Sequence, residues 1–179
     1  MDKNIVLIGF MGTGKSTVGK ILAKKLGREW VDVDQRIEEK EKRRIADIFE
    51  KDGESAFRRL ESRMVQEVAS GSGFVITTGG GAVTDEGNVS ALKANGILVL
   101  LEAAPQTIYQ RVKDSRHRPL LKTGDKLGEI RRLLESRRPF YEKADLKCST
   151  DGKTAQQVAD EILRALADDG EFEFGKDWF

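Results

Sequence analysis

The feature that most constrains this chain is the glycine-rich segment 9–16, GFMGTGKS, which has the spacing G-x-x-x-x-G-K-[ST]. The apolar run 5–8 before it predicts a buried strand. The apolar residues after it recur at helical spacing, at Val18, Ile21, Leu22 and Leu26. Glycines allow the backbone angles that turn several N–H groups toward one anion, and the start of a helix adds its dipole. The segment therefore predicts a phosphate-binding loop between a strand and a helix.

The side chains of this loop are suited to a nucleotide and a metal ion. Lys15 supplies a positive charge for the β- and γ-phosphates, and the Ser16 hydroxyl is placed for Mg²⁺. The phosphate site is expected to be completed by backbone amides, within the set Gly12, Thr13, Gly14, Lys15, Ser16 and Thr17. The alternative is a glycine-rich turn that merely connects strand to helix, and the predicted elements on either side make it the weaker interpretation.

Composition narrows the class of protein. Of the 179 residues, 39% are hydrophobic and 34% are charged, which suits one soluble globular domain with a sizeable core. The formal net charge of +1 gives no general attraction to nucleic acid or to an anionic membrane, and we expect neither as a partner. No apolar run approaches the length that spans a bilayer.

Two rare residue types limit the possible disulfides, the expected cellular location and the possible histidine-based sites. Cys148 is the only cysteine, so an intrachain disulfide is impossible and a reducing cytoplasm is the expected location. Its place in a predicted strand favours a buried structural thiol over a nucleophile. His117 is the only histidine, which excludes a zinc site or a catalytic triad built on several histidines. Because the chain enters its first strand at once, we expect no signal peptide.

Strand and helix patterns alternate along the chain. Strands are predicted over residues 5–9, 30–33, 74–78, 97–101 and 146–149. Helices are predicted over residues 15–26, 35–42, 45–50, 54–69, 86–94, 105–112 and 126–141, with a last helix that carries Val158, Ala159, Ile162 and Leu166. Such alternation indicates an α/β fold, a parallel sheet with helices on both faces. The most hydrophobic strand, 97–101, is expected to be central.

Residues 1–167 are expected to form a single domain, because no repeat or linker divides them. The tail 168–179 is different, since it is acidic and carries four aromatic residues, Phe172, Phe174, Trp178 and Phe179. We interpret it as a frayed or surface-docked terminus. An aromatic anchor for a groove on this chain or on a partner is the open alternative.

Polar residues and glycines follow two of the predicted strands, where ligands of such sheets bind. Asp32 and Asp34 end the second strand, and their spacing places them on one face if strand geometry persists. Near a bound metal and nucleotide, one carboxylate can hold metal-bound water while the other accepts a proton. The alternative is that one of these two carboxylates simply caps the following helix. The glycines 79–81 after the third strand fit a backbone that approaches a ligand closely, with a flexible turn as the alternative.

Several arginines could clamp a carboxylate or a phosphate, namely Arg58, Arg59, Arg116, Arg118, Arg137 and Arg138. Most basic residues of such a chain are solvated surface, so position alone is weak support. The polar stretch 113–124 lies between two predicted helices. Because phosphate transfer must exclude water, we interpret this stretch as a lid, with an ordinary exposed loop as the alternative.

Taken together, these motifs resemble the shikimate kinase family over about residues 3–167. The resemblance is carried by residues 9–17, 32–34, 45–49 (IADIF), 57–61 (FRRLE), 79–83 (GGGAV), 118–121 (RPLL) and 137–141 (RRPFY). It implies a P-loop fold like that of nucleoside monophosphate kinases. It also implies transfer of the γ-phosphate of ATP to the 3-hydroxyl of shikimate, in the pathway to aromatic amino acids. With it we expect a monomer.

The resemblance also implies roles at the acceptor. Asp32 is similar to the family's metal-shell carboxylate, and Asp34 to the residue that holds the substrate hydroxyl and acts as base. Arg58 and Arg137 resemble the clamp on the shikimate carboxylate. Gly80 and Gly81 resemble substrate-facing backbone, and the helical segment of about 35–70 would bind substrate.

On the nucleotide side, the resemblance makes Arg118 the lid arginine that reaches the transferring phosphate. Arg111 matches the position that stacks on adenine. The family often has a proline on the other adenine face, where this chain has Ala155 and no proline follows Pro139. The contacts to adenine on that side are therefore open.

Three other functions remain to be weighed. The first is a different small-molecule or nucleoside monophosphate kinase on the same fold. The second is a nucleotide-dependent binding module such as a GTPase switch, but the chain has no N-K-x-D signature. The third is nucleic-acid binding through the basic run 40–44, where interleaved glutamates favour a solvated helix face instead.

Overall fold

A computed structural model describes residues 3–113 and 125–168 of the chain. Most of the expected lid, with Arg116, His117 and Arg118, lies outside the described residues. So does the tail from residue 169 onward. Asp168, which the sequence pattern assigned to the tail, is the last residue of the final helix.

In the described part of the chain, five parallel strands form one sheet in the order β2-β3-β1-β4-β5. Their bounds are β1 Asn4–Ile8, β2 Trp30–Asp32, β3 Val75–Thr77, β4 Gly96–Glu102 and β5 Leu146–Ser149. β1 is therefore the central strand, and the expectation that residues 97–101 would be central was wrong. β4 is hydrophobic because helices cover both of its faces, and such burial does not require the middle position.

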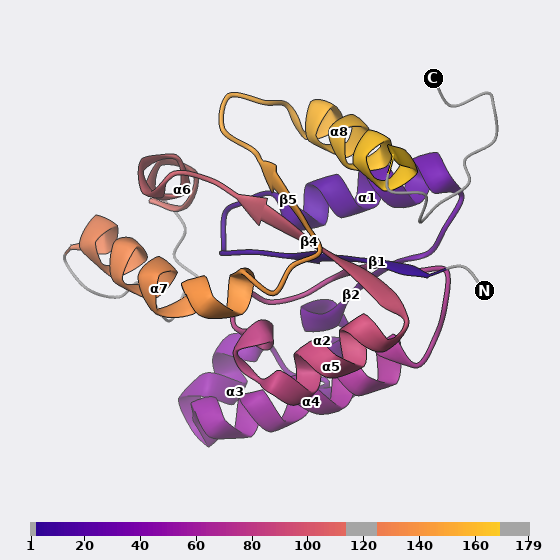
Figure 1. Ribbon diagram of the computed structural model, residues 1–179. Helices are drawn as coiled ribbons and strands as arrows, with labels where there is room; N and C mark the ends of the chain where they lie inside the picture. The colour runs from indigo at the N-terminus through magenta and orange to yellow at the C-terminus, as the bar shows by residue number, and fades with distance from the viewer. Residues whose placement is uncertain (1–2, 114–124, 169–179) are drawn as a thin grey trace.

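The helices lie in two layers, as Figure 1 shows. One layer holds α1 (Lys15–Leu26) and α8 (Ala155–Asp168). The other holds α2 (Val33–Glu41), α3 (Ile45–Asp52), α4 (Glu54–Ala69) and α5 (Glu86–Ala94). The turn η1 (Ala82–Thr84), α6 (Pro105–Val112) and α7 (Lys126–Tyr141) complete the described elements.

The side-chain alternation of β1 divides the core into two clusters. Ile5 and Leu7 pack with α1 and α8, whereas Val6 and Ile8 pack with the helices of the opposite layer. Successive side chains of a strand point to opposite faces, so an uninterrupted apolar run is what a strand covered on both sides needs. The predicted parallel sheet with helices on both faces is confirmed.

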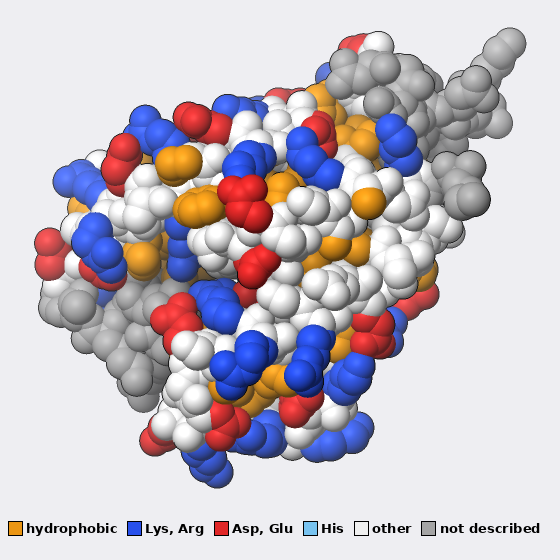
Figure 2. All heavy atoms as spheres, turned by 60° about the horizontal axis from the view of Figure 1, so that its bottom comes forward, with side chains coloured by type: hydrophobic (Ala, Val, Ile, Leu, Met, Phe, Trp, Pro, Cys, Tyr) orange, Lys and Arg blue, Asp and Glu red, His pale blue; other side chains and the backbone are white. Residues whose placement is uncertain are grey.

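Polar side chains of both signs cover the face formed by the layer that holds α4 and α5. Figure 2 shows Lys and Arg interspersed with Asp and Glu on this side of the molecule. Within the basic run 40–44, Lys40 pairs with Glu67 at 2.5 Å and Arg43 with Asp52 at 2.6 Å. No helix in the described ranges is long and apolar enough to cross a bilayer.

Candidate active site

The phosphate-binding loop has the backbone that its glycines predict. Gly9, Gly12 and Gly14 have φ of 138°, 78° and 93°, a region that L side chains rarely adopt. A Cβ atom at Gly9 would also lie 2.4 Å from the carbonyl oxygen of Leu101. α1 begins directly after Gly14 without a side-chain cap, so its amino end faces the loop. The loop therefore presents backbone amides and a helix dipole to one point.

Lys15 lies across this loop. Its Nζ donates to the carbonyl oxygens of Gly9 and Phe10 at 2.8 and 2.9 Å. The ammonium group is thus held at the mouth of the loop, where it can meet the phosphates of a nucleotide.

The strand geometry expected for Asp32 and Asp34 does not persist. β2 ends at Asp32, one residue earlier than predicted, and α2 begins at Val33 rather than at Gln35. Asp32 caps that helix, because its Oδ1 accepts from the Gln35 amide at 3.0 Å. The side chain of Asp34 leaves from the first turn of α2. Both carboxylates still line one cavity, because the helix begins at the edge of the sheet.

Asp32 also faces the phosphate loop. Its Oδ2 accepts from Ser16 Oγ at 3.3 Å and from Thr77 Oγ1 at 2.8 Å. A hydroxyl and a carboxylate this close are suitable ligands for Mg²⁺, which prefers oxygen and takes its remaining ligands from water and phosphate. Within residues 3–113 and 125–168, no group of three or more His, Cys, Asp or Glu side chains could hold a metal ion. The pair fits a metal that arrives with a nucleotide.

Asp34 is the most perturbed carboxylate of the cavity. Burial raises its pKa to about 7, and the negative charges of Asp32 and Glu61 add to that shift, while Lys15 and Arg58 oppose it. Its buried Oδ1 has no hydrogen-bond partner within the described residues. A carboxylate that gains and loses a proton near neutral pH, with an unpaired oxygen, has the properties of a general base.

Arg58 is held in place by two glutamates of its own helix. Its Nη1 donates to Glu61 Oε2 at 2.7 Å and its Nη2 to Glu54 Oε1 at 3.1 Å. Glu61 is buried, and this burial raises its pKa. The guanidinium lies against Gly81, where a Cβ atom would be 2.6 Å from Nη1.

Sequence reasoning missed Glu61, although a signal was present. The side chains of α4 that point into the core are Phe57, Met64, Val65 and Val68, and Glu61 lies among them at 1% exposure. A carboxylate in an apolar helical stripe, three residues after an arginine, indicates a buried ion pair. The aromatic pair Phe49 and Phe57, with ring centroids 4.7 Å apart, also lines the cavity and was not singled out.

Arg137 reaches the same cavity from α7. It is 7% exposed and lies over the ring of Phe10, with the guanidinium carbon 5.5 Å from the ring centroid. Its Nη1 would be 3.3 Å from a Cβ atom at Gly80, and Tyr141 donates to the Gly80 carbonyl oxygen at 2.7 Å. The glycines 79–81 thus form a close-packed backbone rather than a flexible turn.

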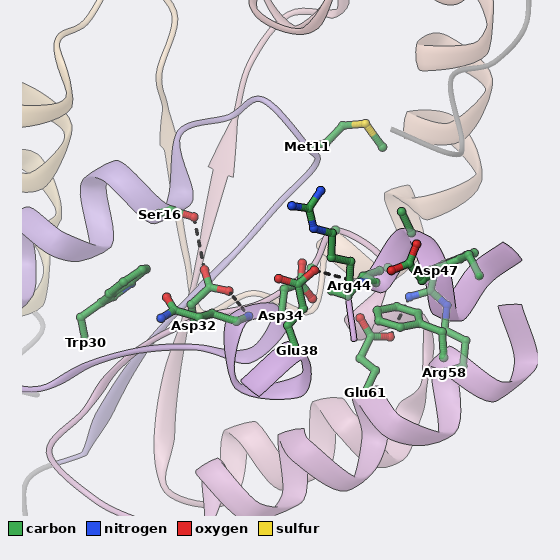
Figure 3. A pocket seen from close by; sticks show the side chains of 18 of the residues that line it. Met11, Ser16, Trp30, Asp32, Asp34, Glu38, Arg44, Asp47, Arg58 and Glu61 are labelled. Atoms are coloured by element: carbon green, nitrogen blue, oxygen red, sulfur yellow. Dashed lines mark hydrogen bonds and ion pairs between the residues drawn. The ribbon is translucent and has the colours of Figure 1, made fainter. Parts of the chain in front are cut away.

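The cavity has a volume of about 890 Å³ and opens at the carboxyl ends of the strands. It brings together all of the expected acceptor and metal residues, namely Ser16, Asp32, Asp34, Arg58, Gly80, Gly81 and Arg137. Figure 3 shows the side chains of Asp32, Asp34, Arg58 and Glu61 on one side and Met11 of the phosphate loop on the other. Arg59 and Arg138 are exposed and do not line it.

Arg111 lies outside this cavity. Its guanidinium donates to the carbonyl oxygen of Gly12 at 3.1 Å and to Thr150 Oγ1 at 3.0 Å. It therefore connects the phosphate loop to the turn after β5. Ala155, the first residue of α8, is half-buried on the α1 side of the sheet.

Comparison with known proteins points to one family. The shikimate kinase family model matches residues 11–167. A shikimate kinase of Persephonella marina is 47% identical over 90% of this chain and 97% of its own length. One of Thermodesulfovibrio yellowstonii is 46% identical over 90% of this chain and 94% of its own.

Comparison with solved structures points to the same family. The shikimate kinase of Acinetobacter baumannii in complex with shikimate has a TM-score of 0.91 and 39% identity, covering 94% of this chain and 95% of that one. The shikimate kinase of Aquifex aeolicus has a TM-score of 0.83 and 40% identity, covering 93% and 98%. A gluconokinase of Sinorhizobium meliloti, at 16% identity and a TM-score of 0.63, shares the fold alone. The P-loop fold of nucleoside monophosphate kinase type is thereby confirmed.

Proposed function

The chain belongs to the shikimate kinase family, and we propose that its cavity transfers the γ-phosphate of ATP to the 3-hydroxyl of shikimate. The family makes it an ATP-dependent kinase. The observation that carries the assignment of residues is the meeting of Asp34, Arg58 and Arg137 in one cavity beside the phosphate loop. A small acceptor with one carboxylate and several hydroxyls needs this set: cations for its carboxylate and a base for its hydroxyl.

The acceptor is bound and oriented by this chain's own groups. We assign Arg58 and Arg137 to the acceptor carboxylate and the backbone of Gly80 and Gly81 to its ring. Glu61 fixes the direction of the Arg58 guanidinium through its 2.7 Å hydrogen bond. Positioning of the two reactants accounts for much of the rate in such transfers.

The transfer itself is an in-line displacement. The acceptor hydroxyl oxygen bonds to the γ-phosphorus, the bond from that phosphorus to the β–γ bridging oxygen breaks, and the hydroxyl proton passes to Asp34. Lys15 and the loop amides offset the charge on the phosphates, while Ser16 and Asp32 would hold Mg²⁺, which supplies further charge neutralisation when bound. Arg118, outside the described residues, is proposed to reach the transferring phosphate, and Arg111 to lie on the adenine side.

A cytoplasmic monomer is the form we propose for the working enzyme. A single buried cysteine, Cys148, agrees with a reducing compartment. ATP and shikimate are the proposed partners, and the balanced surface charge supports neither nucleic acid nor membrane as a third.

The test is a coupled assay of ADP release with Mg²⁺ and ATP. Shikimate should give rapid ADP release, and gluconate, CMP and AMP should stay at the rate seen without acceptor. A rate with gluconate or a nucleoside monophosphate that exceeds the rate with shikimate would replace this proposal with another kinase on the same fold.

A further inference from the structure

Thr77 stands at the end of β3, beside the carboxylate that we assign to the metal. The parallel register of β2 and β3 pairs Asp32 with Thr77, so the two side chains leave the sheet on the same face. Thr77 is 1% exposed, and its Oγ1 donates to Asp32 Oδ2 at 2.8 Å.

Asp32 is held from three elements at once. Its Oδ1 accepts from the Gln35 amide of α2, and its Oδ2 accepts from Thr77 of β3 and from Ser16 of α1. Of these donors, the Ser16 hydroxyl is itself an expected metal ligand. Thr77 and the Gln35 amide belong to neither the phosphate loop nor the ligand set, so they can orient the carboxylate before any nucleotide arrives.

The rotamer of Thr77 is fixed by packing. Its Cγ2 methyl faces Gly19 of α1, where a Cβ atom would lie only 2.7 Å from it. Once the methyl is held against the helix, the chirality of Cβ fixes the direction of the hydroxyl, which donates to Asp32. A β-branched side chain also rotates little about χ1. Gly19 has an ordinary negative φ, so its missing side chain serves this close approach.

We propose that Thr77 is a positioning residue for metal binding: it fixes the orientation of the Asp32 carboxylate, which would hold Mg²⁺ together with Ser16. The inference rests on the proposed function. Residues that orient a ligating carboxylate typically change metal affinity or activity by about 10- to 100-fold when lost. The competing explanation is that the buried Thr77 hydroxyl donates to Asp32 only to satisfy its own hydrogen-bonding capacity, with no effect on metal binding.

Two substitutions separate these explanations. Thr77→Val keeps the volume and the methyl group against Gly19 but removes the hydrogen-bond donor. Thr77→Ser keeps the donor and removes the methyl. Binding of ADP is measured by calorimetry with saturating Mg²⁺ and with EDTA, and the Mg²⁺ concentration that gives half-maximal kcat is determined for each variant.

We expect Thr77→Val to bind ADP in EDTA within about twofold of the wild type. Its Mg²⁺ requirement should rise by about 10-fold or more, and Thr77→Ser should restore it to within about threefold. The KM for shikimate should be unchanged. If Thr77→Val does not fold, Thr77→Ala and Thr77→Ser form the matched pair, because they differ only in the hydroxyl.

An equal Mg²⁺ requirement in the wild type and the variant without the hydroxyl would overturn the inference, even if the melting temperature fell. That outcome differs from failure of the proposed function. If the wild type released no ADP with shikimate, or needed no divalent metal, the proposed function would fail instead.

Discussion

Asp34 carries two requirements that oppose each other. Its proposed proton-accepting role needs the ionised form, while burial penalises that form and raises its pKa to about 7. Its Oδ1 lies next to Gly79, where a Cβ atom would be 3.1 Å from it and equally near Glu61 Oε1. The site thus concentrates negative charge that Lys15 and Arg58 offset only in part.

The first prediction at the scale of the residue concerns activity. Asp34→Asn keeps the size of the side chain and removes the proton acceptor, so kcat should fall by about 10²-fold or more. The affinity for ATP should survive. Near-normal kcat with a large loss of ATP affinity would instead assign Asp34 to the metal.

The same substitution should stabilise the empty protein. An acid whose pKa is raised in the folded state favours folding at low pH, and this contribution is lost as pH rises through about 7. At pH 8, without nucleotide or metal, we expect Asp34→Asn to raise the free energy of unfolding by an amount on the order of 4 kcal/mol. The gain should shrink toward pH 4.5. Urea unfolding at both pH values measures it, and a gain that does not depend on pH would contradict the assigned pKa shift.

Arg137 gives a prediction about the acceptor. Its loss should weaken acceptor binding by roughly 1.5–3 kcal/mol, the contribution of a hydrogen bond to a charged group. For Arg137→Ala the KM for shikimate should therefore rise by about 10-fold or more while the KM for ATP changes little. Arg138→Ala, at the exposed neighbouring position, is the matched control. An effect confined to the KM for ATP would place Arg137 on the nucleotide.

At the scale of the element, the turn after β3 shapes the proposed acceptor site because its glycines have no side chains. Gly80 approaches Arg137, and Gly81 approaches Arg58. Arg58 is held by two glutamates of its own helix, and Arg137 lies over the ring of Phe10. A side chain in this turn would have to displace a guanidinium from these contacts.

Gly81→Ala tests this arrangement. Its Cβ atom would lie 2.6 Å from Arg58 Nη1, so the guanidinium must shift. We expect the KM for shikimate to rise several-fold, with ADP affinity unchanged when measured by calorimetry. Gly87→Ala, in the exposed start of α5, is the control. A loss of ADP affinity in Gly81→Ala would mean that the turn serves the phosphate loop instead.

At the scale of the whole molecule, the described fold and the family match both end at α8. That helix packs on α1 through Val158, Ala159, Ile162 and Leu166, and ends at Asp168. The family model ends at residue 167. Because the described helices already cover both faces of the sheet, we expect the domain to fold without residues 169–179.

A chain shortened after Asp168 should keep kcat within about twofold and its melting temperature within about 2 °C, because we expect the tail to be a frayed terminus that contributes little to stability. Differential scanning calorimetry and the ADP-release assay measure both. A large drop in melting temperature would instead support the open alternative, an aromatic anchor for a groove on this chain.

The sequence by itself determined the order and kind of the elements and the place of the phosphate loop. Helices 54–69, 86–94, 105–112 and 126–141 have the bounds that their patterns predict, because local periodicity and start signals such as Pro105 at the first helical position specify them. The roles assigned to Asp34, Arg58 and Arg137 came from the resemblance and stay predictions.

Only the tertiary structure decided the strand order and the contacts between elements. A buried strand has the same hydrophobic pattern in the centre of a sheet and one position away from the centre. The hydrophobicity of β4 therefore could not reveal that β1 is the central strand. The start of α2 at Val33, the burial of Glu61 and the hydrogen bond from Thr77 to Asp32 each depend on a neighbour far away in sequence. Local pattern carries no information about such a neighbour, because the partner is brought there by the packing of the whole sheet.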